Sequence, residues 1–517
     1  MPTAKPHRAR RVSRATTAVV LTLALGAGPA TAQGPLSAID WLSRSVATPG
    51  AAAAAAPPGG SPVDAVAVMP LDAVARDGAG VGAPADIGLP RRIWGATPAD
   101  DLIALISAER LEALPALRSL FVTLLLTAFD PPLDAGPGER FLLARIDKLL
   151  DMAALEAAEA LIAAAGEPTA ELIRRRFDIA LLLGTEDAAC EALRAAPGID
   201  ATYPTRVFCL ARGGDWQAAS LTLETARALG QVTAADDALL ERFLDPELAE
   251  EGDPLPVPDR PTPLALRLFE AIGEPLPTTG LPLAFAHADL RMTTGWKGRL
   301  DAGERLARAG ALDAALLHAL YVERRPAASG GVWDRVRAVQ RLDAALAARD
   351  AARIAEALPQ AWDAMQQAEI EVPFAVHYAP ALRAVPLDGP AGRLAFRIAL
   401  LAGEAAPLPA GAGPEEAFLA GLARGEMAGL TAPDSLGRAI APAFAADPAA
   451  LLSLRMRGLL DDDRLGEAIL LAMERVAEGA AGDRRGVTEG LAALRVVGLD
   501  GVARQAALQL MLLDRRG

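Results

Sequence analysis

Helical periodicity dominates the sequence from Pro98 onward, and it most constrains the fold. Apolar residues recur at intervals of three and four, and the periodic stretches end near glycine or proline. Examples are ADDLIALISAERLEALPALRSLFVTLLLTAF, RFLLARIDKLLDMAALEAAEALIAAAG and TAELIRRRFDIALLLG. Alternating strand patterns are almost absent. Because aromatic residues make up only 4% of the chain, the 52% hydrophobic content is mostly alanine and leucine, which predicts an all-α fold of closely packed helices.

A pattern of small residues recurs where helical hairpins are expected to turn. A glycine is followed five residues later by alanine, then by apolar or small residues four and three positions further on. The copies are Gly184, Ala189, Leu193, Ala196; Gly214, Ala219, Leu223, Ala226; Gly310, Ala315, Ala319, Val322; and Gly498, Ala503, Ala507, Leu510, with weaker copies at Ala158, Ile162, Ala165 and at Ala468, Ala472. The small residue allows the two helices to cross closely. A spacing of 30 to 35 residues between copies predicts an α-solenoid of helical hairpins.

One copy carries a family resemblance. GDWQAA at 214–219, followed by Leu223 and Ala226, resembles the turn and second helix of the tetratricopeptide repeat, and Tyr203 stands where that repeat's first helix has a bulky residue. Arg206 departs from the family pattern, and no proline closes the unit. The resemblance covers residues 145–232 and extends to the later blocks only in outline. It implies a scaffold that binds peptides or protein surfaces in a concave groove without catalysis of its own.

Composition divides the chain into seven segments. Stretches rich in proline, glycine and alanine carry little apolar bulk and interrupt the helical periodicity. We expect a signal peptide at 1–32, a disordered tract at 33–97, helical blocks at 98–245, 264–402 and 417–517, and proline-rich linkers at 246–263 and 403–416. The linkers are either domain boundaries or long loops between helices.

The first 32 residues have the order typical of a secretory signal peptide. Basic residues precede the apolar run TTAVVLTLALGAG, and Ala30-Thr31-Ala32 forms a small-x-small cleavage site. The run is too short to span a bilayer, and no later stretch is both long and uncharged enough. Abundant arginine with almost no lysine, and no asparagine, is typical of a GC-rich bacterial genome. We therefore expect a periplasmic protein, with secretion as the second choice.

The charge of the mature chain limits its partners. Cleavage removes five of the 51 Lys and Arg residues and none of the 65 Asp and Glu residues, which leaves a net charge near −19. This sign argues against nucleic acid or anionic lipid as the main partner. We expect a protein partner.

A short amphipathic segment at 36–46 lies inside the tract predicted to be disordered. Leu36, Ile39, Leu42 and Val46 fall at helical spacing, with Trp41 beside them. An exposed cluster of this kind is costly without a partner. It either docks into a groove on a partner, docks onto the chain's own folded body, or is a remnant of signal processing.

The two cysteines, Cys190 and Cys209, allow one disulfide in a compartment where disulfides persist. The alternative is two buried free thiols at helix interfaces. A bridge would close a loop of about 20 residues and stabilise the fold by roughly 3 kcal/mol.

No motif for catalysis, a cofactor or a metal is recognisable. His287, His318 and His377 stand in no metal-ligand spacing, and the nucleophile-elbow and phosphate-loop motifs are absent. The loop RRPAASGGVWDRV places Arg324, Arg325 and Trp333 around small residues. It is either a rim that binds a peptide or carboxylate or an inter-helix loop with Trp333 as a core anchor.

These observations predict a non-catalytic periplasmic helical-repeat scaffold or adaptor in a cell-envelope complex. An alternative is a peptidoglycan-associated enzyme of the superhelical lytic transglycosylase type, or its accessory subunit, which would need a catalytic glutamate in a cleft. A third possibility is a structural spacer anchored by its N-terminal segment.

Overall fold

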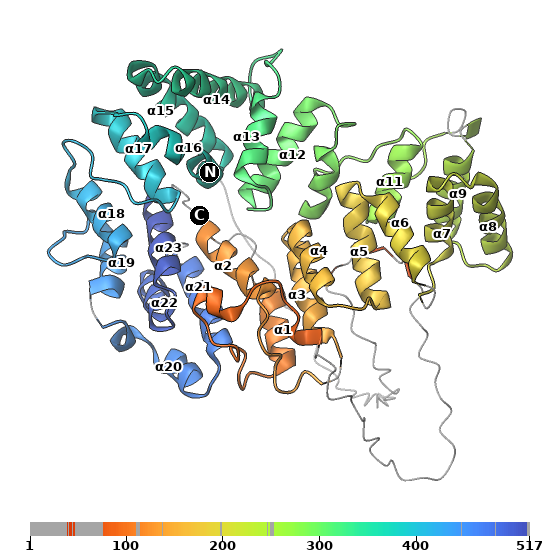
Figure 1. Ribbon diagram of the computed structural model, residues 1–517, viewed down its shortest axis with the longest axis horizontal. Helices are drawn as coiled ribbons and strands as arrows, with labels where there is room; N and C mark the ends of the chain where they lie inside the picture. The colour runs from red at the N-terminus through yellow and green to blue at the C-terminus, as the bar shows by residue number, and fades with distance from the viewer. Residues whose placement is uncertain are drawn as a thin grey trace, which may run out of the picture. The chain divides into compact units, whose positions relative to one another are not determined.

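The computed structural model describes residues 39, 41–43, 45–46, 76–109, 114–136, 138–196, 199–245, 247–248, 253–445, 447–480 and 482–513. Within these residues every regular element is a helix, and extended pairing is limited to isolated β-bridges. The prediction of an all-helical fold is therefore confirmed (Figure 1). The predicted signal peptide at 1–32, and Leu36, lie outside the described residues.

The first group of elements includes the hairpins on which the tetratricopeptide resemblance rests. It comprises two short 3-10 helices and nine α-helices, counted over the described residues. Their bounds are η1 (Arg76–Gly78), η2 (Pro84–Ile87), α1 (Ala99–Ala108), α2 (Pro115–Leu126), α3 (Arg140–Asp151), α4 (Leu155–Ala164), α5 (Ala170–Leu183), α6 (Glu186–Ala195), α7 (Tyr203–Arg212), α8 (Trp216–Ala228) and α9 (Ala234–Leu244).

The remaining elements continue the same local pattern, in which many consecutive helices pack against one another. Their bounds are α11 (Pro263–Ala271), η3 (Leu283–Leu290), α12 (Trp296–Arg308), α13 (Ala314–Val322), α14 (Val332–Ala347), α15 (Ala351–Ala368), α16 (Glu371–Arg383), α17 (Gly389–Leu401), α18 (Pro414–Arg424), α19 (Ser435–Ala445), η4 (Pro448–Leu451), α20 (Leu454–Asp461), α21 (Leu465–Ala480), α22 (Arg484–Val496) and α23 (Asp500–Leu512).

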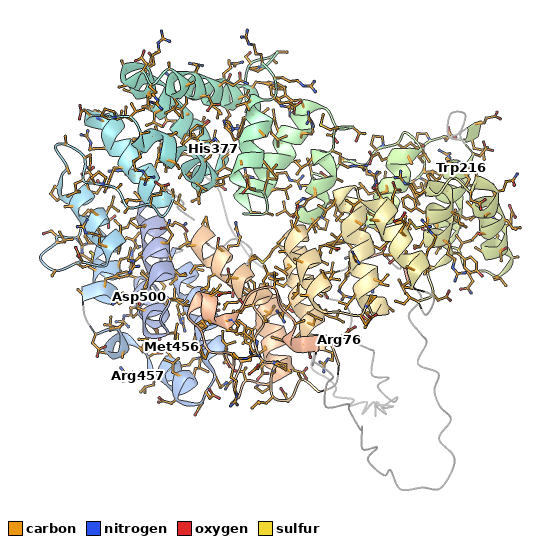
Figure 2. All side chains as sticks on the ribbon, in the orientation of Figure 1. Arg76, Trp216, His377, Met456, Arg457 and Asp500 are labelled. Carbon is orange, nitrogen blue, oxygen red and sulfur yellow. A yellow bond between two sulfur atoms is a disulfide. The ribbon has the colours of Figure 1, made fainter. Side chains whose placement is uncertain are left out.

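The corner between α7 and α8 shows how local sequence sets a hairpin. Gly214 has φ +84°, a conformation that glycine adopts without strain. The Asp215 carboxylate then accepts the Ala218 N–H at 3.0 Å and caps α8. Trp216, labelled in Figure 2, is half exposed, and its ring centroid lies 5.9 Å from that of Phe243 on α9. The cluster is thus a structural corner.

Buried small residues follow most copies of the repeat pattern, with one clear exception. Ala219 and Ala503 are fully buried, as close helix crossing requires. In α13 the prediction is wrong, because Ala315 is exposed and Leu317 and Tyr321 face the core instead.

Contacts between distant helices accompany the local hairpins. Helices α1 and α2 contact α21 and α23, so the first helices lie beside the last ones (Figure 1). Gln509 of α23, almost fully buried, accepts the Ala116 N–H at 2.8 Å. The described residues from 39 to 513 belong to one compact unit, within which residues 253–262 precede α11 and residues 403–413 connect α17 to α18.

The prediction of disorder is wrong for residues 76–97, which we call the core segment. Ile93 is fully buried, and Trp94 packs edge-on against Phe129 and Phe141 at 5.8 and 5.3 Å between ring centroids. The Asp77 carboxylate accepts a backbone N–H of α3 at 2.7 Å. The prediction failed because the tract is rich in small residues on average, although a few large residues within it are buried in the core.

No helix in the described part of the chain has the length and apolar character needed to cross a bilayer.

Candidate functional site

A piece of the N-terminal tract is buried against the helical body, and we call the surface that it covers the groove. We call the buried piece the docked segment; its described residues are 39, 41–43 and 45–46. Ile39, Trp41, Leu42 and Val46 are all less than a tenth exposed. None of the described residues is helical, and Trp41 lies in a turn. The hydrogen bonds of the Ser43 and Ser45 backbones run to the helical body.

The aromatic contact of the docked segment is made by Trp41. Its ring meets the ring of Phe285 edge-on, with centroids 5.4 Å apart. Phe285 is fully buried in η3, which packs against α3, α5 and α12. His287 of η3 is hydrogen-bonded to the Ala153 carbonyl at 2.8 Å. The wall that receives Trp41 is therefore held by helices distant in sequence.

The polar contacts come from one face of α5. Arg174 and Asp178 are four residues apart and so project to the same side of the helix. The Ser43 N–H donates to one carboxylate oxygen of Asp178 at 2.8 Å, and the Ser43 hydroxyl donates to the other. Arg174 Nε donates to the Ser43 carbonyl at 2.6 Å. Every polar group of Ser43 is thus bonded to α5.

The carboxyl of Asp178 is fully enclosed in this arrangement. Burial raises its pKa to about 7, while the two hydrogen bonds from Ser43 and the charges of Arg174 and Arg175 act in the opposite direction. The docked segment therefore covers an acidic group whose protonation changes near neutral pH.

The far end of the docked segment meets the start of α7. The Thr202 N–H donates to the Ser45 carbonyl at 2.9 Å, and Val46 forms an antiparallel β-bridge with Ala201. The Ser45 hydroxyl is also buried, but it has no hydrogen-bond partner among the described residues. The groove thus binds the backbone of Ser45 but makes no hydrogen bond to its side chain among the described residues.

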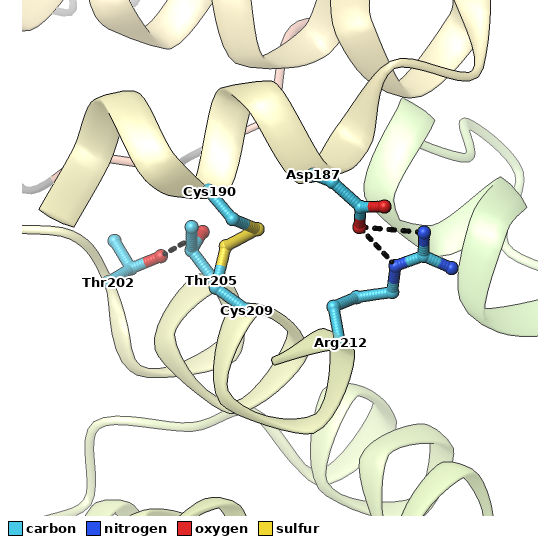
Figure 3. The surroundings of a disulfide bond; sticks show 6 residues. All are labelled: Asp187, Cys190, Thr202, Thr205, Cys209 and Arg212. Atoms are coloured by element: carbon cyan, nitrogen blue, oxygen red, sulfur yellow. Dashed lines mark hydrogen bonds and ion pairs between the residues drawn. A yellow bond between two sulfur atoms is a disulfide. The ribbon is translucent and has the colours of Figure 1, made fainter. Parts of the chain in front are cut away.

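A disulfide braces the helix that follows this contact. Cys190 of α6 and Cys209 of α7 are bonded, with Cα atoms 5.4 Å apart (Figure 3). Arg212 donates twice to Asp187, at 3.0 and 2.7 Å, which adds a second tie between the same two helices.

A pocket of about 570 Å³ opens beside the disulfide. Ala201, which forms the β-bridge with Val46, lines this pocket. Arg194 and Arg206 also line it, and Arg206 forms an ion pair with Asp200 of the same lining. The pocket adjoins the end of the groove.

The predicted rim residues lie elsewhere: Arg324 and Arg325 in the loop between α13 and α14, and Trp333 in the first turn of α14. Arg324 Nε donates to Glu323 at 2.9 Å, and Arg325 is exposed. Trp333 is half buried, with its ring centroid 5.0 Å from that of Trp296. Trp333 therefore packs as an anchor of α14, and the structure does not bring it to the docked segment.

Two histidines come together where sequence spacing gave no indication. The rings of His318 and His377 stack with centroids 3.9 Å apart, and His318 Nε2 lies 3.0 Å from an Asp343 carboxylate oxygen. Among the described residues, no group of three or more potential ligands is placed to hold a metal ion.

Searches of family models, curated proteins and solved structures found no match to this chain.

Proposed function

We propose that this chain is a non-catalytic helical-repeat scaffold, built as a tetratricopeptide-like α-solenoid and exported to the periplasm, that binds an extended segment of a partner protein in a cell-envelope complex. The binding site is the groove that holds the docked segment. The observation that carries the proposal is that this groove holds a non-helical segment of the chain with its apolar side chains buried.

The contacts suit peptide recognition in general. Arg174 and the Thr202 N–H engage backbone carbonyls, and the bridge at Ala201 adds a strand-like pairing. Contacts of this type hold an extended backbone regardless of sequence, while a few side-chain pockets supply selectivity. The aromatic wall at Phe285 provides one such anchor.

The chain's own segment would compete with a partner for this groove. A ligand that can bind only the open form has its affinity reduced by the fraction of molecules that are open. The partner segment must therefore bind more tightly than the docked segment, or meet a chain from which that segment has been released.

A variant of the full chain tests the proposal. Trp41→Ala removes the aromatic anchor and should release the docked segment without disturbing the helices. We expect this variant to bind a fluorescent peptide of residues 38–48, AIDWLSRSVAT, at least about tenfold more tightly than the wild-type chain does, because more of its grooves are open. Fluorescence anisotropy measures the binding.

The same peptide with its tryptophan replaced by alanine is the matched control and should bind weakly. Circular dichroism checks that the variant is folded, and hydrogen exchange checks that its segment is released. A folded, released variant that binds no peptide contradicts the proposal.

A further inference from the structure

Asp178 makes the one hydrogen bond to a side chain of the docked segment that the described residues of the groove form. We propose that Asp178 selects extended segments that carry a serine or threonine two residues after a tryptophan, and that the partner segment belongs to this uncharged, hydroxyl-bearing class. This inference rests on the proposed function and adds a specificity rule to it.

The geometry at Ser43 carries the inference. Both Asp178 oxygens are used by a single residue, one by the Ser43 N–H and the other by its hydroxyl. Any residue except proline can supply the N–H, but only a short side chain with a donor can also reach the second oxygen. Serine and threonine have such a side chain.

Burial makes this second contact necessary. Ser43 is 2% exposed, and Asp178 is fully buried. Replacing the serine by alanine leaves one oxygen of a buried carboxylate without its partner, and an unsatisfied buried polar group is more costly than the average hydrogen bond is favourable. An acidic or phosphorylated residue at this position would place a second negative charge against the carboxylate.

The other hydrogen bonds between the groove and the docked segment go to its backbone and do not depend on its side chains. Arg174 binds the carbonyls of Leu42 and Ser43, and Thr202 binds the carbonyl of Ser45. A carbonyl is present in every residue, so these bonds position the ligand and leave its sequence open. Selectivity at this end therefore depends on Asp178, and two positions earlier on the contact between Trp41 and Phe285.

Ser45 provides a matched internal control. It is buried, as Ser43 is, and it lies in the same segment, but its hydroxyl has no hydrogen-bond partner among the described residues. Removing this hydroxyl deletes no contact that the structure shows. The hydroxyl of Ser43 therefore has a hydrogen-bond partner in the groove, whereas that of Ser45 has none among the described residues.

The first measurement uses the full chain, so it needs no peptide in trans. Hydrogen exchange of the fragment covering the docked segment is compared between Ser43→Ala and Ser45→Ala, each corrected for its intrinsic exchange rate. We expect Ser43→Ala to increase opening of the segment by about tenfold or more, and Ser45→Ala to leave it unchanged or to reduce it. Equal effects of the two substitutions overturn the inference.

The second measurement uses the full-length Trp41→Ala chain and the peptide of residues 38–48. The Ser43→Ala and Ser43→Glu peptides should bind at least about tenfold more weakly than the unmodified peptide, and the Ser45→Ala peptide should bind equally well. Adding Asp178→Asn to the chain should bring the Ser43→Ala and Ser43→Glu peptides within a few-fold of the unmodified one. Unchanged discrimination in the Asp178→Asn chain overturns the inference.

The two proposals fail in distinguishable ways. If no peptide binds the open chain while Ser43→Ala still loosens the tethered segment, the groove serves only its own segment and the proposed function fails. If peptides bind and the Ser43 and Ser45 substitutions are equivalent, the function stands and the specificity rule fails.

Discussion

Two segments that precede the first long helix each insert a tryptophan into the helical body, but the body holds them differently. Trp94 of the core segment packs against the rings of Phe129, which follows α2, and Phe141 of α3. Among the aromatic rings of the described residues, Trp41 of the docked segment meets only that of Phe285. Both tryptophans are buried. The difference lies in how many other parts of the fold depend on each segment.

Contacts of the core segment join both ends of the helical chain. The Val81 N–H donates to the Leu126 carbonyl in α2 at 2.8 Å, and the Gly466 N–H in α21 donates to the Ile93 carbonyl at 2.7 Å. The fully buried guanidinium of Arg145 in α3 also donates to the Asp77 carbonyl at 3.1 Å. Removing this segment would leave polar groups of several helices unpaired.

Hydrogen bonds and a ring contact run from the described residues of the docked segment to α5, η3 and the start of α7. Its polar bonds run to Arg174, Asp178 and Thr202, and water can replace them when the segment leaves. The comparison shows that burial alone does not distinguish a structural segment from a displaceable one. The distinguishing property is whether the bonding partners stay satisfied without the segment.

The largest expected effect is a difference in stability between variants of the two tryptophans. Trp94→Ala should lower the free energy of unfolding by about 3–5 kcal/mol, because it opens a cavity among packed helices. Trp41→Ala should cost much less in global unfolding, because the segment can detach locally while the helices stay folded. Denaturant titration of both variants measures the difference. Equal losses would mean that the docked segment is part of the cooperative core.

The second effect concerns the disulfide next to the groove. Replacing Cys190 and Cys209 by alanine should lower the free energy of unfolding by about 3 kcal/mol, since the bridge closes a loop with a sequence separation of 19. Exchange should also increase in the docked segment, because α7 begins at the residues that hold Ser45 and Val46. Exchange in the core segment should not change. A uniform increase across both segments would contradict this local role.

Helical hairpins could be predicted because their signals are local. Gly214 and Asp215 specify a turn and a cap through their own backbone and side-chain preferences. The register of α13 could not be predicted in the same way. Asp313 caps this helix, and the face turned to the core is then set by helices distant in sequence, which select Leu317 and Tyr321.

The groove could be predicted only in part. Hydrophobic residues indicated that the segment around Trp41 docks somewhere, but its partners Asp178 and Phe285 lie more than 130 residues away, and no local pattern joins them. One signal was present: Asp178 interrupts the apolar end of α5, and a charged residue inside such a run requires a buried partner. The order of residues 76–97 was missed because composition averages over a window, whereas a few residues such as Ile93 and Trp94 anchor the segment.

The smallest expected effect is a dependence of docking on pH that should not involve the core segment. Burial raises the pKa of Asp178 to about 7 in the docked state, and we expect the ordinary value of 3.8 when the segment leaves and water reaches the carboxyl. The docked state then binds a proton more tightly than the open state. Docking is therefore strongest below about pH 4, weakens as the pH rises toward 7, and is constant above that.

Hydrogen exchange of the docked segment at pH 5 and pH 7.5, corrected for the intrinsic pH dependence of exchange, should show opening that is roughly fifty- to a hundredfold greater at the higher pH. Asp178→Asn should abolish this dependence, since an amide does not titrate. Asp77→Asn is the matched control, because Asp77 is also buried with a raised pKa but belongs to the core segment, and it should leave the pH dependence of docking intact. If Asp77→Asn removed that dependence as well, the two segments would open together, and the distinction between a structural and a displaceable segment would fail.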